Sequence, residues 1–157
     1  MRLALFQPDI PQNLGAAIRL GACLDVPIEV VEPCGFPLSD AAIRRSAMDY
    51  AVQAQVTRHA GWSDFREMAR RDHRRIILFT THSTRALHGF EFAADDILLF
   101  GRESAGVPNE VHQGCDAALV IPLAAGARSL NVVTAAAIAL SEALRQTNAF
   151  PTASGNS

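Results

Sequence analysis

Two segments of this chain place glycine, arginine, glutamate and small polar residues directly after short apolar runs. One spans residues 101–108 and contains Arg102 and Glu103, and the other spans residues 127–131. Glycine at the end of a strand lets the backbone approach a ligand closely. Charged residues beside such glycines are hard to explain by the packing of a protein core. We therefore expect the two turns to contribute to one ligand site.

Other common types of site are absent from the sequence. No G-x-G-x-x-G follows the first apolar run, and Gly106 is followed by Val-Pro, which excludes a phosphate-binding P-loop. The five histidines lack the spacing of metal ligands, so we expect no metal. Cys23, Cys34 and Cys115 are far apart and form no Cys-x-x-Cys pair. This spacing indicates neither a disulfide framework nor a zinc site.

Length and composition predict a single domain over residues 1–150, followed by a disordered tail at 151–157. No apolar run reaches the length of a membrane span, and the N-terminal apolar run is too short for a signal peptide. We therefore expect a soluble, cytoplasmic protein without a membrane partner.

Basic charge is unevenly distributed along the chain. The formal net charge is −2, which argues against a general nucleic-acid coat, yet all 14 basic residues are arginine and many lie in the middle third. Arginine suits bidentate contacts with phosphate and stacking on bases. For the densest run, between Arg66 and Arg75, a solvated helix face balanced by Asp64, Glu67 and Asp72 is an equally good interpretation.

The elements that must position these residues follow from the apolar pattern. Strands alternate with helices, and several strands are continuously apolar, which predicts an α/β domain with a mostly parallel sheet flanked by helices. The last helix is apolar on nearly every face, so we expect it to pack on the sheet and on a partner subunit in a homodimer. The predicted strands cover residues 2–6, 27–31, 53–57, 75–80, 96–100 and 117–121, and the predicted helices cover 13–23, 39–48, 63–71 and 130–145.

Three groups of residues, in order along the chain, resemble the motifs of one enzyme family. They are Asn13, Gly15 and Arg19; then Phe100, Gly101, Glu103, Gly106 and Pro108; then Ile121, Pro122, Arg128, Ser129 and Asn131. With this order and spacing, the chain resembles the SPOUT (SpoU-TrmD) RNA methyltransferases over residues 3–145. The resemblance is strongest to the TrmL/YibK-like branch, which methylates the ribose of the tRNA wobble nucleotide. It implies a deep trefoil knot at the C-terminal end.

The resemblance also implies a cofactor, S-adenosyl-L-methionine (AdoMet), which would leave as S-adenosyl-L-homocysteine. Its site would lie among three loops of the knot. A glycine at position 101 would leave room for the cofactor, although a tight turn is an alternative reason for it. The residues implied as cofactor-binding are Phe79, Gly101, Ile121, Ser129 and Leu130.

The reaction implied is attack of a ribose 2′-oxygen on the methyl carbon of a sulfonium. Arg19, Glu103, Asn131 and Asn13 are implied as catalytic. Arg19 stays protonated, so we expect it to stabilise the developing alkoxide or to hold a phosphate. A helix N-cap is the alternative role of Asn13.

We expect RNA to be bound by Arg58, His59, Tyr50 and Arg128, with Tyr50 or His59 stacking on an unpaired base. The substrate implied is the wobble pyrimidine, nucleotide 34, of tRNA. Methylation of another tRNA or rRNA site, and a non-catalytic homologue that binds RNA or AdoMet, remain alternatives. Val133 and Ser141 depart from the pattern of the branch, and Ser141 bears on substrate choice.

Overall fold

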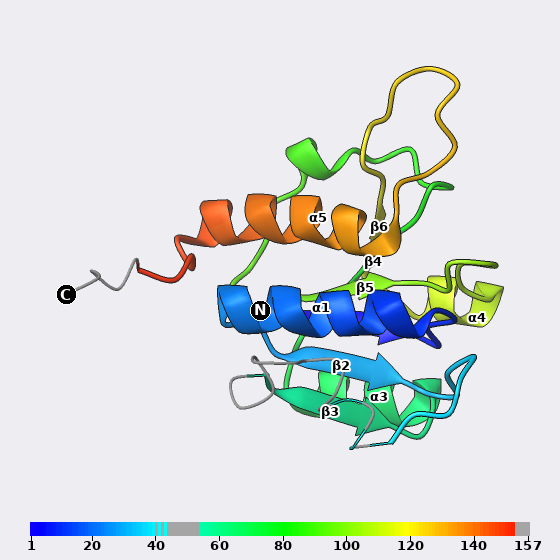
Figure 1. Ribbon diagram of the computed structural model, residues 1–157. Coiled ribbons are helices and arrows are strands. Elements are labelled where there is room, and N and C mark those ends of the chain that lie inside the picture. The colour runs from blue at the N-terminus through cyan, green and yellow to red at the C-terminus, as the bar shows by residue number, and fades with distance from the viewer. Residues whose placement is uncertain (40, 42, 44–53, 153–157) are drawn as a thin grey trace.

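The computed structural model describes residues 1–39, 41, 43 and 54–152. Its centre is a six-stranded sheet in the order β3-β2-β1-β5-β4-β6, and all five strand pairings are parallel (Figure 1). The strands are β1 (Arg2–Phe6), β2 (Ile28–Val31), β3 (Val56–His59), β4 (Ile76–Phe79), β5 (Ile97–Phe100) and β6 (Ala117–Leu119).

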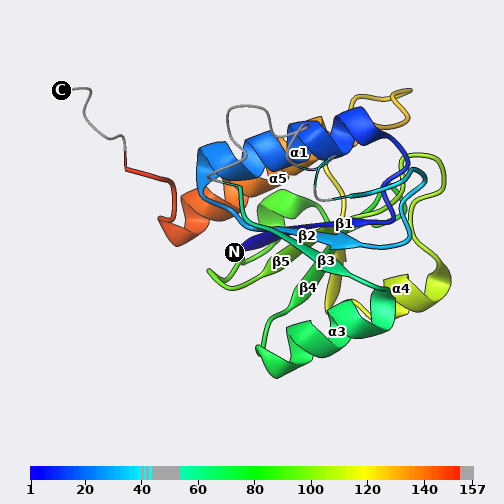
Figure 2. The same cartoon turned by 60° about the horizontal axis from the view of Figure 1, so that its bottom comes forward.

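Helices cover both faces of the sheet, which is why its central strands are apolar throughout. Figure 2 shows α1 (Pro11–Leu24) and α5 (Val132–Thr147) on one face, and α3 (Trp62–Arg71) and α4 (Asn109–Gln113) on the other. Alternate residues of β1 divide between two cores accordingly. Leu5 packs with residues of α1 and α5, whereas Phe6 packs with residues of α3 and α4. The α/β architecture predicted from the sequence is confirmed.

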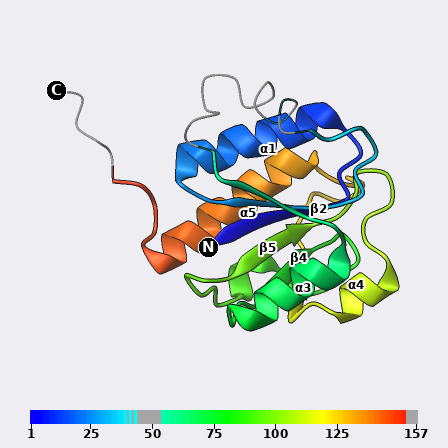
Figure 3. The ribbon, with the colours of Figure 1, turned by 90° about the horizontal axis from the view of Figure 1, so that it is seen from below.

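The register brings the carboxyl ends of the central strands to one edge. Leu5 of β1 and Phe79 of β4 both pair with Phe100 at the end of β5. The loops that follow β1, β4, β5 and β6 therefore leave the sheet on the same side. In Figure 3, α1 and α5 lie side by side across the sheet, so the start of α5 comes near the start of α1.

Helix α1 begins earlier than the sequence predicted, and Asn13 is not its N-cap. The N-cap is Ile10, whose side chain makes no capping hydrogen bond, and Pro11 occupies the first turn. Proline suits that position because its fixed φ is helical and its missing N–H would have no partner there. Asn131, predicted to lie inside the last helix, is instead the N-cap of α5. The short α4 and a 3₁₀ turn at Leu87–Gly89 were not predicted.

Some predictions lie outside the described residues. These are most of the helix predicted at 39–48, Tyr50, and residues 153–157 of the predicted tail. The strand predicted at 53–57 is found at Val56–His59. The trefoil knot remains a prediction from the family resemblance. In the described part of the chain, no helix has the length and apolar character needed to cross a membrane.

Candidate functional site

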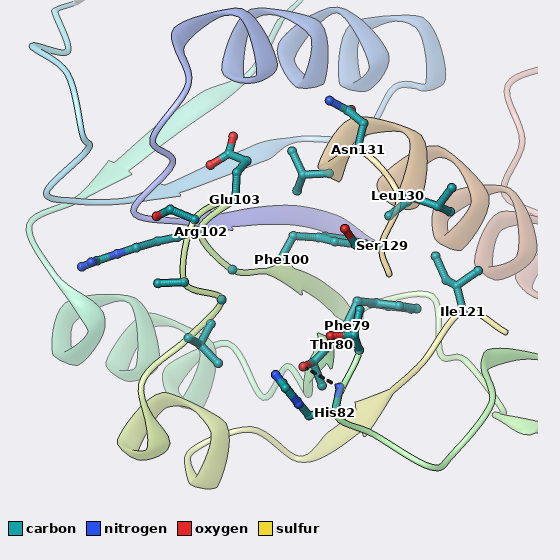
Figure 4. Close-up of a pocket in the computed structure, with 18 of the residues that line it drawn as sticks. Phe79, Thr80, His82, Phe100, Arg102, Glu103, Ile121, Ser129, Leu130 and Asn131 are labelled. Atoms are coloured by element: carbon teal, nitrogen blue, oxygen red, sulfur yellow. Dashed lines mark hydrogen bonds between the residues drawn. The ribbon is translucent and has the colours of Figure 1, made fainter. Parts of the chain in front are cut away.

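The loops at the carboxyl edge of the sheet enclose a pocket of about 560 Å³. Phe79 and Phe100 line its inner part as a stacked pair, with ring centroids 5.0 Å apart, and both side chains are buried. Ile10 and Leu130 line the same pocket but are 41% and 38% exposed. Figure 4 shows Phe79, Ile121 and Leu130 grouped on one side of the pocket and Glu103 on the other. Such a crevice beyond parallel strand ends is the usual ligand site of an α/β sheet.

Three polar side chains from distant parts of the chain form a hydrogen-bonded row along this pocket. Asn13 donates from Nδ2 to Oε1 of Glu103 at 2.9 Å. Asn131 donates from Nδ2 to Oδ1 of Asn13 at 3.1 Å. The backbone N–H of Asp9 donates to Oε2 of Glu103 at 2.9 Å. The row, here called the Asn13–Glu103–Asn131 row, joins the start of α1, the loop after β5 and the start of α5.

The helix cap of α5 determines the direction of every hydrogen bond in this row. Oδ1 of Asn131 accepts from the backbone N–H groups of Val133 and Thr134, at 2.9 and 3.3 Å. Its amide nitrogen is therefore the group that faces Asn13. Asn13 must in turn present its oxygen to Asn131 and its nitrogen to Glu103. Both carboxylate oxygens of Glu103 are then acceptors, and no amide of the row is free to flip.

A second contact braces the loop after β5 against the loop after β1. Ser104 donates to Oδ2 of Asp9 from its hydroxyl and from its backbone N–H, the latter at 3.1 Å. These hydrogen bonds, from the hydroxyl first and the backbone second, hold the pKa of the Asp9 carboxyl below its usual range. On the other side of Asp9, the N–H of Gly35 donates to the carbonyl of Pro8 at 2.9 Å. Residues 8–10 are thus held from two sides.

The glycines of the loop after β5 are explained by the loop itself. Arg102 and Gly106 exchange two backbone hydrogen bonds of 2.9 Å, which closes the loop. A Cβ at Gly101 would lie 2.6 Å from the carbonyl carbon of Gly106, and Gly106 has a φ of +64°. The tight-turn explanation of Gly101 is therefore sufficient. Clearance for a cofactor remains a prediction.

We expect Gly101→Ala to destabilise the protein and to weaken binding of AdoMet, the cofactor that the family resemblance implies. The new methyl group would collide with backbone rather than with a movable side chain, so the loop must open to accommodate it. The expected loss of unfolding free energy is about 1–3 kcal/mol. Thermal unfolding and calorimetric titration with AdoMet measure the two effects. Gly89→Ala is the matched control, because a Cβ there meets no atom within 4 Å. Equal unfolding temperatures for the two variants would contradict the prediction.

The structure brings most of the predicted site residues together. All five predicted cofactor residues line the pocket, and so does Arg128. Asn13, Glu103 and Asn131 line it as well and form the row described above. Sequence reasoning did not single out Asp9, nor Ser104 and residues 80–82 of the lining, although each lies at or shortly after the end of a predicted strand, which offered a signal.

Arg19 is the exception among the predicted catalytic residues. It lies on α1 six residues after Asn13, which places it about 9 Å farther along the helix and roughly 120° around it. Its side chain is exposed, and it does not line the pocket of its own chain. One chain alone therefore does not bring Arg19 to the other predicted catalytic groups.

Two of the predicted RNA contacts are engaged within the protein. Nε of Arg58 donates to Oε1 of Glu32 at 2.8 Å, and a second guanidinium nitrogen donates to Oε2 at 3.1 Å. His59 is only 8% exposed, with Nε2 2.6 Å from Oε2 of the buried Glu29. Its ring also packs edge-on against Phe65. In this conformation His59 therefore offers little surface to a base, and its part in RNA binding stays a prediction.

The cysteines differ in their environments. Burial, and to a lesser extent the carboxylate of Glu32, raise the pKa of the Cys34 thiol to about 11. Burial likewise raises the pKa of Cys115 to about 12. Cys23 is exposed on α1.

We expect a thiol reagent at neutral pH to modify Cys23 first. Only the thiolate reacts, so a pKa near 11 should slow Cys34 roughly a hundredfold relative to an ordinary thiol, and Cys115 more. Time-resolved mass spectrometry of the labelled peptides provides the measurement. Cys23→Ser should remove the fast phase. A fast phase that remains in this variant would show that a buried thiol is accessible.

In the part of the chain that the structure describes, no group of three or more His, Cys, Asp or Glu side chains is arranged to hold a metal ion.

Comparison with known proteins gives a consistent result. Residues 1–141 match the model of the SpoU rRNA methylase family. A tRNA (cytidine(34)-2′-O)-methyltransferase of Ancylobacter novellus is 51% identical over 150 residues, which is 96% of this chain and 95% of the relative. A solved structure concerned with the 2-OH methylation of C/U34 on tRNA has a TM-score of 0.85 and 36% identity, and covers 92% of this chain and 94% of its own.

A further solved structure shows the fold with a cofactor bound. It is the SpoU methyltransferase AviRb from Streptomyces viridochromogenes in complex with AdoMet. Its TM-score is 0.82 at 27% identity, with 93% of this chain and 57% of that chain covered.

Proposed function

Because this chain belongs to the SpoU rRNA methylase family, we propose that it is an AdoMet-dependent ribose 2′-O-methyltransferase that acts on the wobble pyrimidine, nucleotide 34, of tRNA. The observation that carries the proposal is the Asn13–Glu103–Asn131 row. It joins one residue from each of the three family motifs at a single pocket. A protein that merely kept the fold would not need these three side chains in mutual contact.

The pocket suits AdoMet in size and chemistry. A volume of about 560 Å³ is within the range of pockets that bind small molecules. Phe79, Ile121 and Leu130 offer apolar surface for the adenine (Figure 4). The loop at Gly101 and the loop at Ser129 supply polar groups for the rest of the molecule. When bound, AdoMet supplies an electrophilic methyl group on a sulfonium.

The protein must align the ribose 2′-hydroxyl and stabilise the charge that develops on its oxygen. The rigid row keeps Glu103 and Asn131 in one geometry, which suits alignment of a reacting group. A guanidinium cannot act as a general base, because it stays protonated at any working pH. Arg19 therefore acts electrostatically, on the developing alkoxide or on the adjacent phosphate.

In a homodimer, Arg19 of one subunit reaches the pocket of the other subunit. Since Arg19 does not reach the pocket of its own chain, a second copy supplies it. Ala16 and Arg19 are exposed along one face of α1, and Ile138 of the neighbouring α5 is 38% exposed. The small side chain of Ala16 and the apolar side chain of Ile138 allow two helix pairs to approach closely across a two-fold axis.

A single-stranded anticodon suits a small enzyme that cannot open a duplex. Arg128 lines the pocket and is exposed, so it is well placed to bind an RNA phosphate. Arg58 would first have to release Glu32. A tRNA substrate also implies a cytoplasmic location.

Ribose methylation of rRNA is the second candidate, and the description of the matching family model favours it. The two candidates differ in substrate and share the cofactor and the reaction. A direct assay on both RNAs therefore separates them.

The experiment supplies the dimer with labelled AdoMet and with tRNA from cells that lack the modification, and locates the methyl group by nucleoside mass spectrometry. A 2′-O-methylated pyrimidine at nucleotide 34 is the expected product. A synthetic tRNA with a 2′-deoxyribose at nucleotide 34 is the matched control and should accept no methyl group. Transfer to rRNA alone would favour the second candidate, and AdoMet binding without transfer to either RNA would contradict both.

A further inference from the structure

Ile10 is an unusual residue for its position in the fold. It is the N-cap of α1, where Ser, Thr, Asp or Asn would accept a hydrogen bond from the first turn, and its side chain makes no such bond. Core packing does not explain it either, because Ile10 is 41% exposed. A residue that neither caps the helix nor packs in the core points to a functional requirement.

The backbone holds Ile10 rigidly despite this exposure. The preceding residue, Asp9, donates its N–H to Glu103 and accepts two hydrogen bonds from Ser104. The carbonyl of Ile10 accepts from the N–H groups of Asn13 and Leu14, at 3.1 and 3.3 Å. An apolar side chain fixed in this way loses little conformational freedom when a ligand covers it.

The position of Ile10 in the pocket indicates which ligand it meets. Phe79 and Phe100, in the inner part of the pocket, are 7% and 3% exposed, whereas Ile10 lies where the pocket opens to solvent. A small cofactor can enter a cavity of about 560 Å³ whole. An RNA can insert only one nucleotide into the pocket. The rest of the RNA must therefore contact the residues at the opening of the pocket. Ile10 lies on the same loop and helix start as Asn13, whose side chain belongs to the row.

We propose that Ile10 is a substrate-binding residue, against which the base or ribose of the target nucleotide packs while its 2′-hydroxyl is in the pocket. The inference rests on the proposed function and extends it from the cofactor to the substrate nucleoside. The faces of a pyrimidine and the C–H groups of a ribose are apolar, so an exposed aliphatic side chain gains from covering either one. The polar row then orients the nucleotide and Ile10 contributes affinity.

Ile10→Ser separates binding from folding, because serine removes the apolar surface but adds the missing cap acceptor. The expected result is a rise of about tenfold in KM for tRNA, from the lost burial of the exposed part of the side chain, with a smaller change in kcat. AdoMet affinity and sedimentation should match those of the wild type, and the unfolding temperature should not fall. Ile10→Val should keep KM within about twofold of the wild type. Phe150→Ser is the control, since Phe150 is 45% exposed and does not line the pocket.

The outcomes distinguish this inference from the function on which it rests. If the wild-type protein transfers no methyl group to tRNA, the proposed function fails and takes the inference with it. If the wild type is active and Ile10→Ser has an unchanged KM, the inference alone is overturned. A loss of AdoMet affinity equal to the rise in KM would assign Ile10 to the cofactor site. A shift to a smaller species in sedimentation would assign it to the interface between subunits.

Discussion

Arg19→Ala is expected to abolish methyl transfer while AdoMet affinity stays nearly unchanged. Arg19 lies outside the pocket of its own chain, so its loss should leave the cofactor contacts intact. Removing a charge that stabilises a developing oxyanion lowers kcat by about a hundredfold to a thousandfold. Single-turnover transfer to tRNA and calorimetric titration with AdoMet measure the two quantities separately. A parallel loss of both would contradict the assigned role.

A matched control for this prediction is Arg71→Ala. Arg71 is also an exposed arginine on a helix, but it lies on α3, at the opposite face of the sheet, and contacts Asp72. Its replacement removes the same charge from the protein and should leave transfer unchanged. If both variants lost activity equally, Arg19 would be acting only through the overall charge of the protein.

Mixing two inactive variants tests whether Arg19 acts across a dimer. Arg19→Ala keeps an intact pocket, and Glu103→Ala keeps an intact Arg19. If a second copy supplies the arginine, a heterodimer of the two contains one complete site, and the mixture should regain part of the wild-type activity. If Arg19 acts within its own chain, no combination of the two variants contains a complete site, and the mixture stays inactive.

Glu103→Gln is expected to reduce methyl transfer by about ten- to a hundredfold and to lower the free energy of unfolding by about 1–3 kcal/mol. Both oxygens of Glu103 accept hydrogen bonds, from the N–H of Asp9 and from Asn13. Glutamine offers one oxygen and one NH₂ group, so one of these donors would face another donor. The disturbance passes along the row to Asn131 and to the cap of α5. Chemical denaturation and kcat measurements check the two parts of the prediction.

A double-mutant cycle shows whether the effect travels through the row. Glu103→Gln disturbs the hydrogen bonds of the row and Asn13→Ala removes one of them, so together they should cost less than the sum of the single changes. Glu67→Gln, an exposed carboxylate on α3, is the control and should behave as the wild type. Additive losses would mean that Glu103 acts independently of Asn13.

Much of the architecture was determined by local sequence patterns. Continuously apolar runs such as Ile97–Phe100 predicted buried parallel strands, because a strand covered by helices on both faces has no polar side. The glycines and polar residues after these runs predicted a ligand site at the strand ends, and the pocket lies there. Gly101, Glu103 and Asn131 lie in these turns, and the family resemblance implied their roles. Residue type and short-range spacing both lie in the primary sequence.

The partners of side chains were decided only by the tertiary structure. Asn13 contacts Glu103 and Asn131 across 90 and 118 positions of the chain, and no periodicity carries information over such separations. The burial of His59 likewise depends on Glu29, which lies on the neighbouring strand. Asn13 was a plausible helix cap, but α1 begins at Pro11 and its N-cap is Ile10, whereas Asn131, predicted inside the last helix, caps α5. Local patterns determine which residues form a helix or a strand. The packing of helices and strands against one another determines which side chains come into contact, and the site depends on those contacts.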